Sequence, residues 1–354
     1  MKRGDSGFSL LELIIALAIV ASVLVAASTF FIGVVRQYKV QTKITESNVE
    51  GVLGLELMRQ DIESLGFGLP WNSLSSYTER SGVHSSIAAL NESPNAPRPV
   101  VSINNAASGV SLNGSDYLVI RSARVGMDNA AGKWTTLSSA NVKRSWGSPD
   151  DDMDNGDWVV VLSTGTTDST RQSLAGTSTF GTTGGLVPTE AFQTNIVYGI
   201  GAVSPVRPFN RADYFVADNA AYTRPRHCAS NTGVLVKGAI AHDATGTATL
   251  FPLLDCVADM QVVYGLDTDA DPSTPLVPSD DISGLATNAL RTQLKEIHVH
   301  ILAHTGQRDE TFTYPATTVS VGSGGFVDNV DVSGFRNYRW KVYNIVVRPT
   351  ALAD

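Results

Sequence analysis

The hydrophobic residues of the chain are concentrated at its start. The run from Leu13 to Val35 contains 23 residues and no charge. An apolar helix needs about 20 residues to cross the roughly 30 Å hydrocarbon core of a bilayer, so this run predicts a membrane-spanning helix. It is longer than the roughly 7–15 apolar residues of a secretory signal, and no clear cleavage site follows it. Lys2 and Arg3 precede the run, which predicts that the start of the chain stays in the cytoplasm while the rest crosses.

The helical pattern continues beyond Val35, although the sequence becomes more polar. Apolar residues recur mostly every three or four positions, which predicts one stripe along a longer helix: Val40, Ile44, Val52, Leu55, Met58, Ile62 and Leu65. The segment Gly66-Phe67-Gly68 and Pro70 then end the pattern. A helix from Phe8 to Leu65 would be about 87 Å long. We expect its first half in the membrane and the stripe of its second half against a folded domain.

From Pro70 onward, short apolar runs bounded by turn residues replace the helical pattern. These runs predict strands at residues 117–121, 158–162, 196–203, 213–217, 233–240, 260–266, 295–303 and 338–347. Polar residues fill the connections, among them the stretch 163–185. The expected fold class is α+β, with a long N-terminal helix packed on one mainly antiparallel β domain over residues 67–354.

The charge balance narrows the range of functions. The 354 residues include 26 Lys and Arg against 34 Asp and Glu, a formal net charge of −8. A nucleic-acid-binding protein would carry a basic patch or a high isoelectric point, so no nucleic-acid partner is expected. The chain also has no P-loop, dinucleotide fingerprint or G-x-S-x-G motif. We therefore expect neither an enzyme nor a cofactor, apart from the calcium considered below.

One carboxylate lies inside the apolar start of the chain. Glu12 comes five positions after Gly7, and an ionised side chain costs about 3 kcal/mol at the centre of a membrane helix. Such a residue is a functional candidate by default. The segment Gly7-Phe8-Ser9-Leu10-Leu11-Glu12 and the apolar run after it resemble the class III signal of type IV pilins and of type II secretion pseudopilins.

The resemblance implies a specific maturation. A prepilin peptidase would remove residues 1–7 by cutting between Gly7 and Phe8 on the cytoplasmic side, and would N-methylate Phe8. Residues 8–35 would remain as membrane anchor and assembly helix, and residues 36–66 would continue it as an amphipathic helix. Glu12 would be the glutamate that docks the subunit onto its neighbours.

The resemblance also implies partners and a location. The partners are the prepilin peptidase, the major pilin, other minor pilins, an inner-membrane assembly platform, and membrane lipid around residues 8–35. The subunit would first be a single-pass inner-membrane protein with a periplasmic globular domain. It would later be part of a pilus at the cell surface.

Three further features bear on the kind of subunit. The stretches Leu53 to Gly68 and Leu253 to Gly265 resemble PilW-like minor pilins. Thr29 stands where major pilins usually have a helix-kinking proline, whereas Asp5 makes the leader less basic than the common pattern. We expect a minor pilin that helps to initiate type IV pilus assembly near the tip. The alternatives are a minor pseudopilin of a type II secretion system and, from another class, a single-pass periplasmic binding or sensor protein.

The chain has two cysteines, Cys228 and Cys256. In an oxidising periplasm, paired cysteines are normally bridged. Closing a loop of about 28 residues would stabilise the fold by about 3–4 kcal/mol in the chain-entropy model. The alternatives are two free buried thiols, or half of a zinc site that needs four ligands.

Two groups of residues are metal candidates. Glu296, His298 and His300 alternate along a predicted strand and share one face, where His304 could add a further ligand; the alternative is a polar, solvent-facing surface. Two D-x-D-x-D stretches resemble the start of calcium loops: Asp150, Asp152, Asp154, Asp267, Asp269 and Asp271. Neither stretch has both the Gly and the Glu of an EF-hand, so hydrated turns are the alternative.

Overall fold

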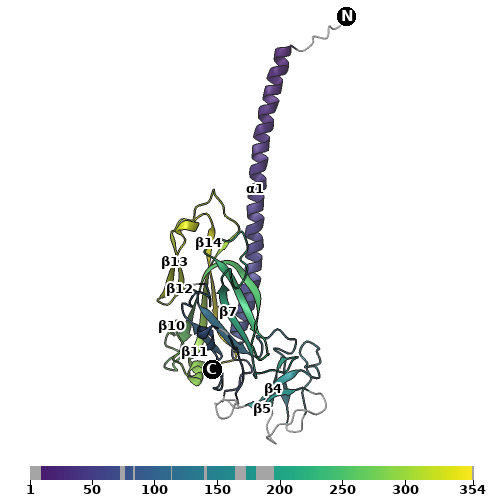
Figure 1. Cartoon of the computed structure of the whole chain (residues 1–354), viewed down its shortest axis with the longest axis vertical. Coiled ribbons are helices and arrows are strands. Elements are labelled where there is room, and N and C mark those ends of the chain that lie inside the picture. Colours follow the sequence, from purple (N-terminus) through teal and green to yellow (C-terminus); the bar gives the residue numbers. More distant parts are fainter. Residues whose placement is uncertain are drawn as a thin grey trace.

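The computed structural model describes residues 9–71, 76–82, 84–112, 114–138, 142–163, 173–180 and 195–352. A single long helix, α1 (Leu10–Glu63), extends far beyond a β-rich body that packs against its second half (Figure 1). The predicted α+β fold, a long N-terminal helix on a mostly antiparallel β domain, is confirmed.

The helix ends two residues before the predicted Leu65. Gly66 and Gly68 take left-handed backbone conformations, with φ of 81° and 73°. The N–H of Gly66 donates to the carbonyl oxygen of Arg121 at 3.0 Å, so the chain passes from the helix directly onto the sheet. Asp61 joins the last turn to the same sheet, because it pairs with Lys237 at 2.5 Å and accepts a hydrogen bond from Tyr214.

The main sheet has eight strands, and every neighbouring pair is antiparallel. Its order is β1 (Val100–Ile103), β2 (Tyr117–Ser122), β7 (Asn210–Ala217), β8 (Gly233–Ile240), β9 (Ala248–Leu266), β11 (Leu294–Thr305) and β14 (Arg339–Val347), with β10 (Val277–Ser279) paired to β9. The predicted strand 260–266 is therefore only the last part of a 19-residue strand.

A second sheet is inserted between β2 and β7, which are direct neighbours in the main sheet. Its order is β3 (Trp134–Leu137), β6 (Asn195–Gly201), β4 (Trp158–Leu162) and β5 (Ser173–Thr179). It lies at the end of the molecule farthest from the start of α1 (Figure 1). The prediction that residues 163–185 only connect strands is wrong for β5, which is a Ser- and Thr-rich edge strand without the apolar alternation that would have announced it.

The remaining elements are small. A hairpin of β12 (Thr318–Ser323) and β13 (Phe326–Asp331) covers part of the sheet face that points away from α1, followed by the short 3-10 helix η1 (Ser333–Phe335). Two short helices, α2 (Ser85–Ala88) and α3 (Thr287–Gln293), lie in connections. None of these elements was predicted, because each is short or, like β13, alternates between half-buried and exposed residues without a strong apolar face.

The main core lies between α1 and the sheet. Leu55, Met58, Ile62 and Leu65 from the predicted stripe are buried against strand residues such as Met260, Val262, Ile297, Val299 and Ile301. Ile44 is half-buried and lies beside Gly306. Val52 was assigned to the stripe wrongly, since its side chain is 63% exposed, and the side chain of Val40 lies outside the described part.

A buried charge network fixes the opposite face of the sheet. Glu79 accepts hydrogen bonds from Arg121 at 2.7 Å and from Arg211 at 2.8 Å, and all three side chains are fully buried. Arg211 also pairs with Asp213 at 2.7 Å. Burial alone would raise the pKa of Asp213, but Arg211 holds it below its ordinary value. The network ties the segment 76–82 to β2 and β7.

Candidate assembly site

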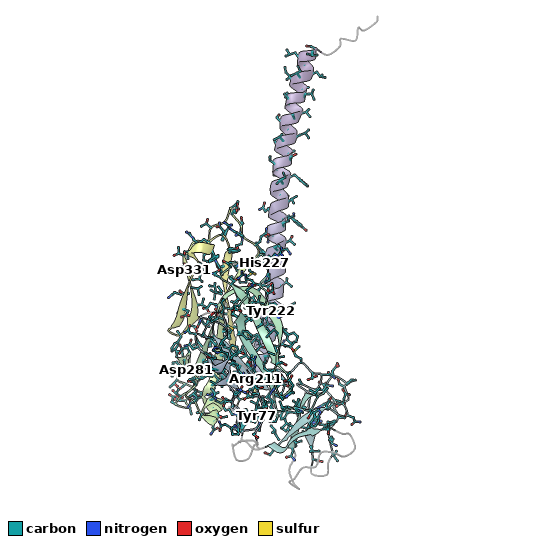
Figure 2. All side chains as sticks on the ribbon, in the orientation of Figure 1. Tyr77, Arg211, Tyr222, His227, Asp281 and Asp331 are labelled. Atoms are coloured by element: carbon teal, nitrogen blue, oxygen red, sulfur yellow. A yellow bond between two sulfur atoms is a disulfide. The ribbon has the colours of Figure 1, made fainter. Side chains whose placement is uncertain are left out.

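The first half of α1 has no covering partner within the described structure. Its large apolar side chains project into open space along the whole segment (Figure 2). Those exposed by half or more are Leu10, Leu11, Leu13, Ile14, Ile15, Leu17, Ile19, Val20, Val23, Leu24, Val25, Phe30, Phe31 and Ile32. The segment Leu10–Thr45 is long and apolar enough to cross a membrane. Its 36 residues would measure about 54 Å, well above the roughly 30 Å that lipid tails cover.

Glu12 closes the first turn of this helix. The backbone N–H of Ser9 donates to the Glu12 carboxylate at 3.0 Å, and the Ser9 hydroxyl accepts from the N–H of Leu11 at 3.3 Å. This reciprocal arrangement is a capping box. In the single subunit, the carboxylate is therefore held at the end of the helix by a backbone donor. Gly7 and Phe8, the predicted cleavage and methylation positions, lie outside the described residues.

The helix runs without interruption through Thr29, the position discussed for proline. The Thr29 hydroxyl donates to the carbonyl oxygen of Ala26 at 2.9 Å, and Ser22 bonds to Ile19 in the same way at 2.8 Å. These hydroxyls are satisfied inside the helix, so they can enter an apolar environment without an unpaired donor. The stretch Leu13 to Val35 is therefore internally hydrogen-bonded as well as uncharged and apolar.

A second exposed apolar surface lies farther along α1 and was missed from the sequence. Val49, Leu53 and Leu57 are spaced by four and are 56%, 65% and 53% exposed. Leu53, Gly54 and Leu57 form one wall of a groove of about 430 Å³, whose other wall is the β9 segment Pro252 to Asp255. This surface could have been predicted from the sequence, because residues spaced by four lie on one face of a helix. We call the surface formed by Leu53, Gly54, Leu57 and the segment Pro252 to Asp255 the aliphatic groove.

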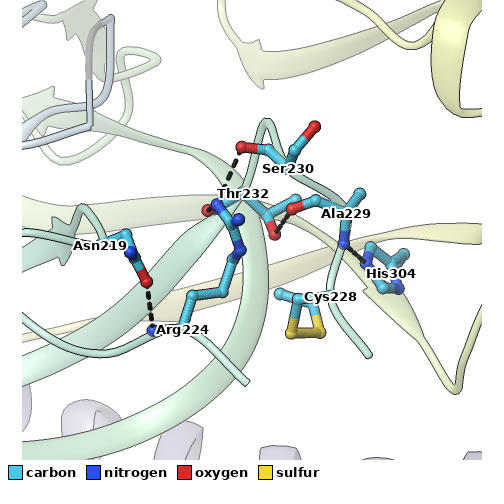
Figure 3. The surroundings of a disulfide bond; sticks show 8 residues. Asn219, Arg224, Cys228, Ala229, Ser230, Thr232 and His304 are labelled. Atoms are coloured by element: carbon cyan, nitrogen blue, oxygen red, sulfur yellow. Dashed lines mark hydrogen bonds between the residues drawn. A yellow bond between two sulfur atoms is a disulfide. The ribbon is translucent and has the colours of Figure 1, made fainter. Parts of the chain in front are cut away.

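The predicted disulfide between Cys228 and Cys256 is confirmed, with 5.0 Å between the two Cα atoms. It ties the loop before β8 to β9 (Figure 3). Beside it, the N–H of Ala229 donates to Nε2 of His304 at 3.0 Å. Burial lowers the pKa of His304 to about 3, so its ring is neutral and can accept this bond. Arg224 closes the loop by donating to the carbonyl oxygens of Ser230 and Thr232.

The histidine strand has hydrogen-bonding partners of its own. Both ring nitrogens of His300 are engaged, with Asn344 at 2.8 Å and Ser323 at 2.9 Å, and His298 lies 3.0 Å from Glu296. The solvent-facing alternative is wrong for His300, because its side chain is buried. His304, the further ligand considered, is buried as well. Where the structure describes side chains, three potential ligand atoms converge only at His227, Cys228 and Cys256, and there both sulfur atoms belong to the disulfide.

The aspartates of the two D-x-D-x-D stretches take part in turns. Asp152 accepts from the N–H groups of Trp146 and Gly147 and from the Ser145 hydroxyl, and these bonds lower its pKa. Asp267, Asp269 and Asp271 accept from Ala270, Asp271 and Ser273 respectively. Neither set brings three carboxylates together within the described ranges. Calcium binding at either loop stays a prediction.

The comparisons with known proteins bear on the start of the chain. Residues 2–28 match the family model described as the prokaryotic N-terminal methylation motif. No curated protein and no solved structure is significantly similar to the chain. The motif covers Glu12 and most of the exposed apolar segment of α1, and it implies processing by a prepilin peptidase and assembly with other pilins. The chain thus carries the class III signal of prepilin-type proteins, followed by an apolar helix that suits a membrane anchor, and it is consistent with a type IV pilin-like protein.

Proposed function

We propose that the protein is a minor pilin that helps to initiate and assemble a type IV pilus near its tip. Its role is structural rather than catalytic. The observation that carries the proposal is the methylation motif at residues 2–28 placed on a helix whose apolar side chains have no partner in the described subunit. Such a helix is stable in lipid as a single subunit and needs other apolar helices once it leaves the membrane.

Glu12 gives the helices their axial register. After cleavage, Phe8 would carry the new amino group, four residues before Glu12. A staggered neighbour could place its own amino group beside this carboxylate, so that both charges are neutralised away from water. Among the described residues of the single subunit, the Glu12 carboxylate accepts a hydrogen bond from the Ser9 backbone. A cationic partner would replace that neutral donor with a stronger, charge-assisted bond.

The aliphatic groove supports the same proposal at a different position along α1. Leu53 lies 43 residues beyond Leu10, about 65 Å along the helix. Lipid that surrounds the start of α1 does not reach this far. Exposed leucines beside a groove with aliphatic walls indicate a protein contact. The uncharged apolar half of a neighbouring subunit's helix has the matching chemistry.

Two features favour a minor over a major subunit. The helix is continuous from Leu10 to Glu63, with Thr29 hydrogen-bonded inside it, so it lacks the weak point that a proline would create. The globular part is also large, with an eight-stranded sheet and an inserted four-stranded sheet. A bulky subunit fits a low-copy position better than a closely repeated one.

Deletion of the gene tests the assignment. The minor-pilin proposal expects loss of surface pili with protein secretion unchanged, and complementation by the intact gene should restore the pili. Loss of secretion with normal pili would favour the minor pseudopilin alternative. If neither process changes and the chain keeps its Met1, the protein is the single-pass binding or sensor protein.

A further inference from the structure

A polar cleft of about 980 Å³ lies between the last turn of α1 and the inserted sheet. Its walls come from the end of α1, the loops on both sides of β3, and Thr350 near the C-terminus. The inserted sheet lies at the end of the molecule farthest from the start of the apolar helix (Figure 1), so the cleft beside it is also far from that start. Its volume is in the range of small-molecule binding sites, about 300–1,000 Å³. Assembly through α1 does not account for it.

Two indole rings line this cleft. Trp134, at the start of β3, and Trp146, in the loop after it, are both half-buried, and their ring centroids lie 4.8 Å apart. The Trp146 N–H donates to the carbonyl oxygen of Trp134 at 2.7 Å. The guanidinium of Arg144 lies 4.3 Å above the Trp146 ring and extends the flat surface. Aromatic side chains with one apolar part and one wet edge are typical of binding surfaces.

The loop that carries Trp146 is held in place before any ligand arrives. The Asp152 carboxylate accepts from the backbone N–H of Trp146 at 2.6 Å and from the Ser145 hydroxyl at 2.7 Å. Lys133, which is almost fully buried, donates to the carbonyl oxygen of Pro149 at 3.0 Å. The position of the indole is therefore fixed by groups outside the cleft's open space. A preorganised site loses less conformational entropy on binding.

Several other polar side chains of the cleft have no partner among the described residues. Asp128, Asn129, Asp150 and Asp151 are exposed, and their side chains make no hydrogen bond or ion pair with the described parts of the chain. On the facing wall, the guanidinium of Arg124 lies 4.4 Å over the Phe67 ring and has no ion-pair partner among the described residues. The cleft thus offers carboxylate and amide oxygens that can accept hydrogen bonds from a ligand, and a guanidinium group that can donate them, beside the indole rings.

The residues that line the cleft disfavour two classes of ligand. Among the described residues, five carboxylates line the cleft against two cations: Asp61, Glu63, Asp128, Asp150 and Asp151 against Arg124 and Lys133. This balance of charge disfavours nucleic acids and acidic glycans. Ala131 is the one aliphatic side chain that the described part of the chain contributes to the lining, which disfavours lipids and apolar peptides. A neutral ligand with many hydroxyl groups and apolar C–H faces fits both observations.

We propose that this cleft binds a neutral oligosaccharide. The hydroxyl groups of the sugar donate to Asp128, Asp150 and Asp151 and accept from Arg124, and charge-assisted bonds of this kind are the stronger ones. The C–H face of a sugar ring packs on the Trp134 and Trp146 pair. The binding site is separate from the assembly surfaces of α1, so it places a ligand-binding function at the distal end of the subunit.

The test uses the full chain in detergent and isothermal calorimetry with neutral tetrasaccharides of glucose, mannose, galactose and N-acetylglucosamine. At least one of them should bind saturably. Trp146→Ala should weaken that binding by about tenfold or more. Because Trp146 also packs on Trp134, the double variant Asp128→Asn and Asp151→Asn serves as a second probe. Both side chains are exposed and make no hydrogen bond or ion pair with the described residues, and the double variant should weaken binding similarly.

Trp158→Phe is the matched control, because Trp158 belongs to the same small sheet but does not line the cleft, and it should bind like the parent. The proposal is overturned if none of the four sugars binds at millimolar concentration, or if the bound sugar is unaffected by both cleft variants. Tetralysine, tested in parallel, covers the basic-peptide alternative. Saturable binding of tetralysine in place of every sugar would also overturn the proposal.

Discussion

Gly54 of α1 lies directly against the backbone of Leu253 in β9, so closely that a Cβ atom at position 54 would overlap the Leu253 carbonyl group. One turn earlier, a Cβ at Gly51 would come within 2.9 Å of the Leu254 side chain. The two glycines therefore set the distance between the helix and the sheet. The same approach forms the wall of the aliphatic groove.

This contact predicts that Gly54→Ala destabilises the protein although alanine favours helices. The added methyl group must push α1 away from β9, an overpacking that costs about 1–3 kcal/mol. Denaturant unfolding of the protein in detergent measures it. Gly33→Ala is the matched control, because a Cβ there meets nothing within 4 Å of the described structure, and it should leave the unfolding midpoint unchanged or raise it. Equal unfolding midpoints for the two variants would show that the close contact between Gly54 and Leu253 does not require a glycine.

The aliphatic groove predicts an assembly defect without a folding defect. In the double variant Leu53→Asp and Leu57→Asp, both side chains are more than half exposed, so the stability of the subunit should change by less than about 1 kcal/mol. Surface piliation, counted by electron microscopy in a complemented deletion strain, should fall sharply. Val327→Asp, an exposed position on β13, should assemble normally. Normal piliation of the double variant would show that the aliphatic groove takes no part in pilus assembly.

Glu12 has two roles that one pair of variants separates. Glu12→Gln keeps a side chain that can complete the capping box with Ser9 but removes the charge, whereas Glu12→Ala removes both. If the carboxylate neutralises a neighbour's amino group, both variants should be cleaved normally and both should fail to assemble. Immunoblots of the processed form and pilus counts give the two readouts. Full assembly of the glutamine variant would assign the residue to helix capping alone.

The carboxyl groups of Asp116 and Asp259 predict a pH dependence of stability. Burial raises the pKa of Asp116 to about 7 and that of Asp259 to about 6. Above about pH 4, the folded state therefore binds more protons than the unfolded state. The free energy of unfolding consequently falls as the pH rises through the pKa values that these two groups have in the folded protein. His242 and His304, whose pKa burial lowers to about 3, act in the opposite direction below about pH 6.5.

Asp259→Asn removes one of these groups and also the Asp259 charge that helps to raise the pKa of Asp116, and both effects act in the same direction. Relative to the parent, the variant should gain about 1 kcal/mol of unfolding free energy between pH 5 and pH 8. Urea unfolding at pH 5, 6, 7 and 8 measures the difference. A difference that stays constant across this range would mean that Asp259 is ionised in the folded protein throughout.

The helix and its signal could be predicted because their information is local. Twenty-three uncharged residues and a helical stripe are visible without knowledge of the fold, and α1 ends within two residues of the predicted position. Val52 shows the limit of this reasoning. It lies three positions before the buried Leu55, yet its side chain is 63% exposed, so its spacing alone could not decide its burial.

The parts that depend on contacts distant in sequence could not be predicted. Glu79 and Arg211 are 132 residues apart and look like ordinary surface charges, yet they bury each other. The insertion of the small sheet between β2 and β7 follows from strand pairing, which no local pattern records. Trp134 and Trp146 were not singled out, because only the folding of the loop on Asp152 brings their rings together.

Processing of the N-terminus is the most direct test of the prepilin assignment. Mass spectrometry of the protein extracted from membranes should find a chain that begins at an N-methylated Phe8, as the match of residues 2–28 to the methylation motif leads us to expect. In a strain without prepilin peptidase, the same protein should retain residues 1–7. An intact Met1 in the presence of the peptidase would contradict the prepilin assignment and with it the proposed role in pilus assembly.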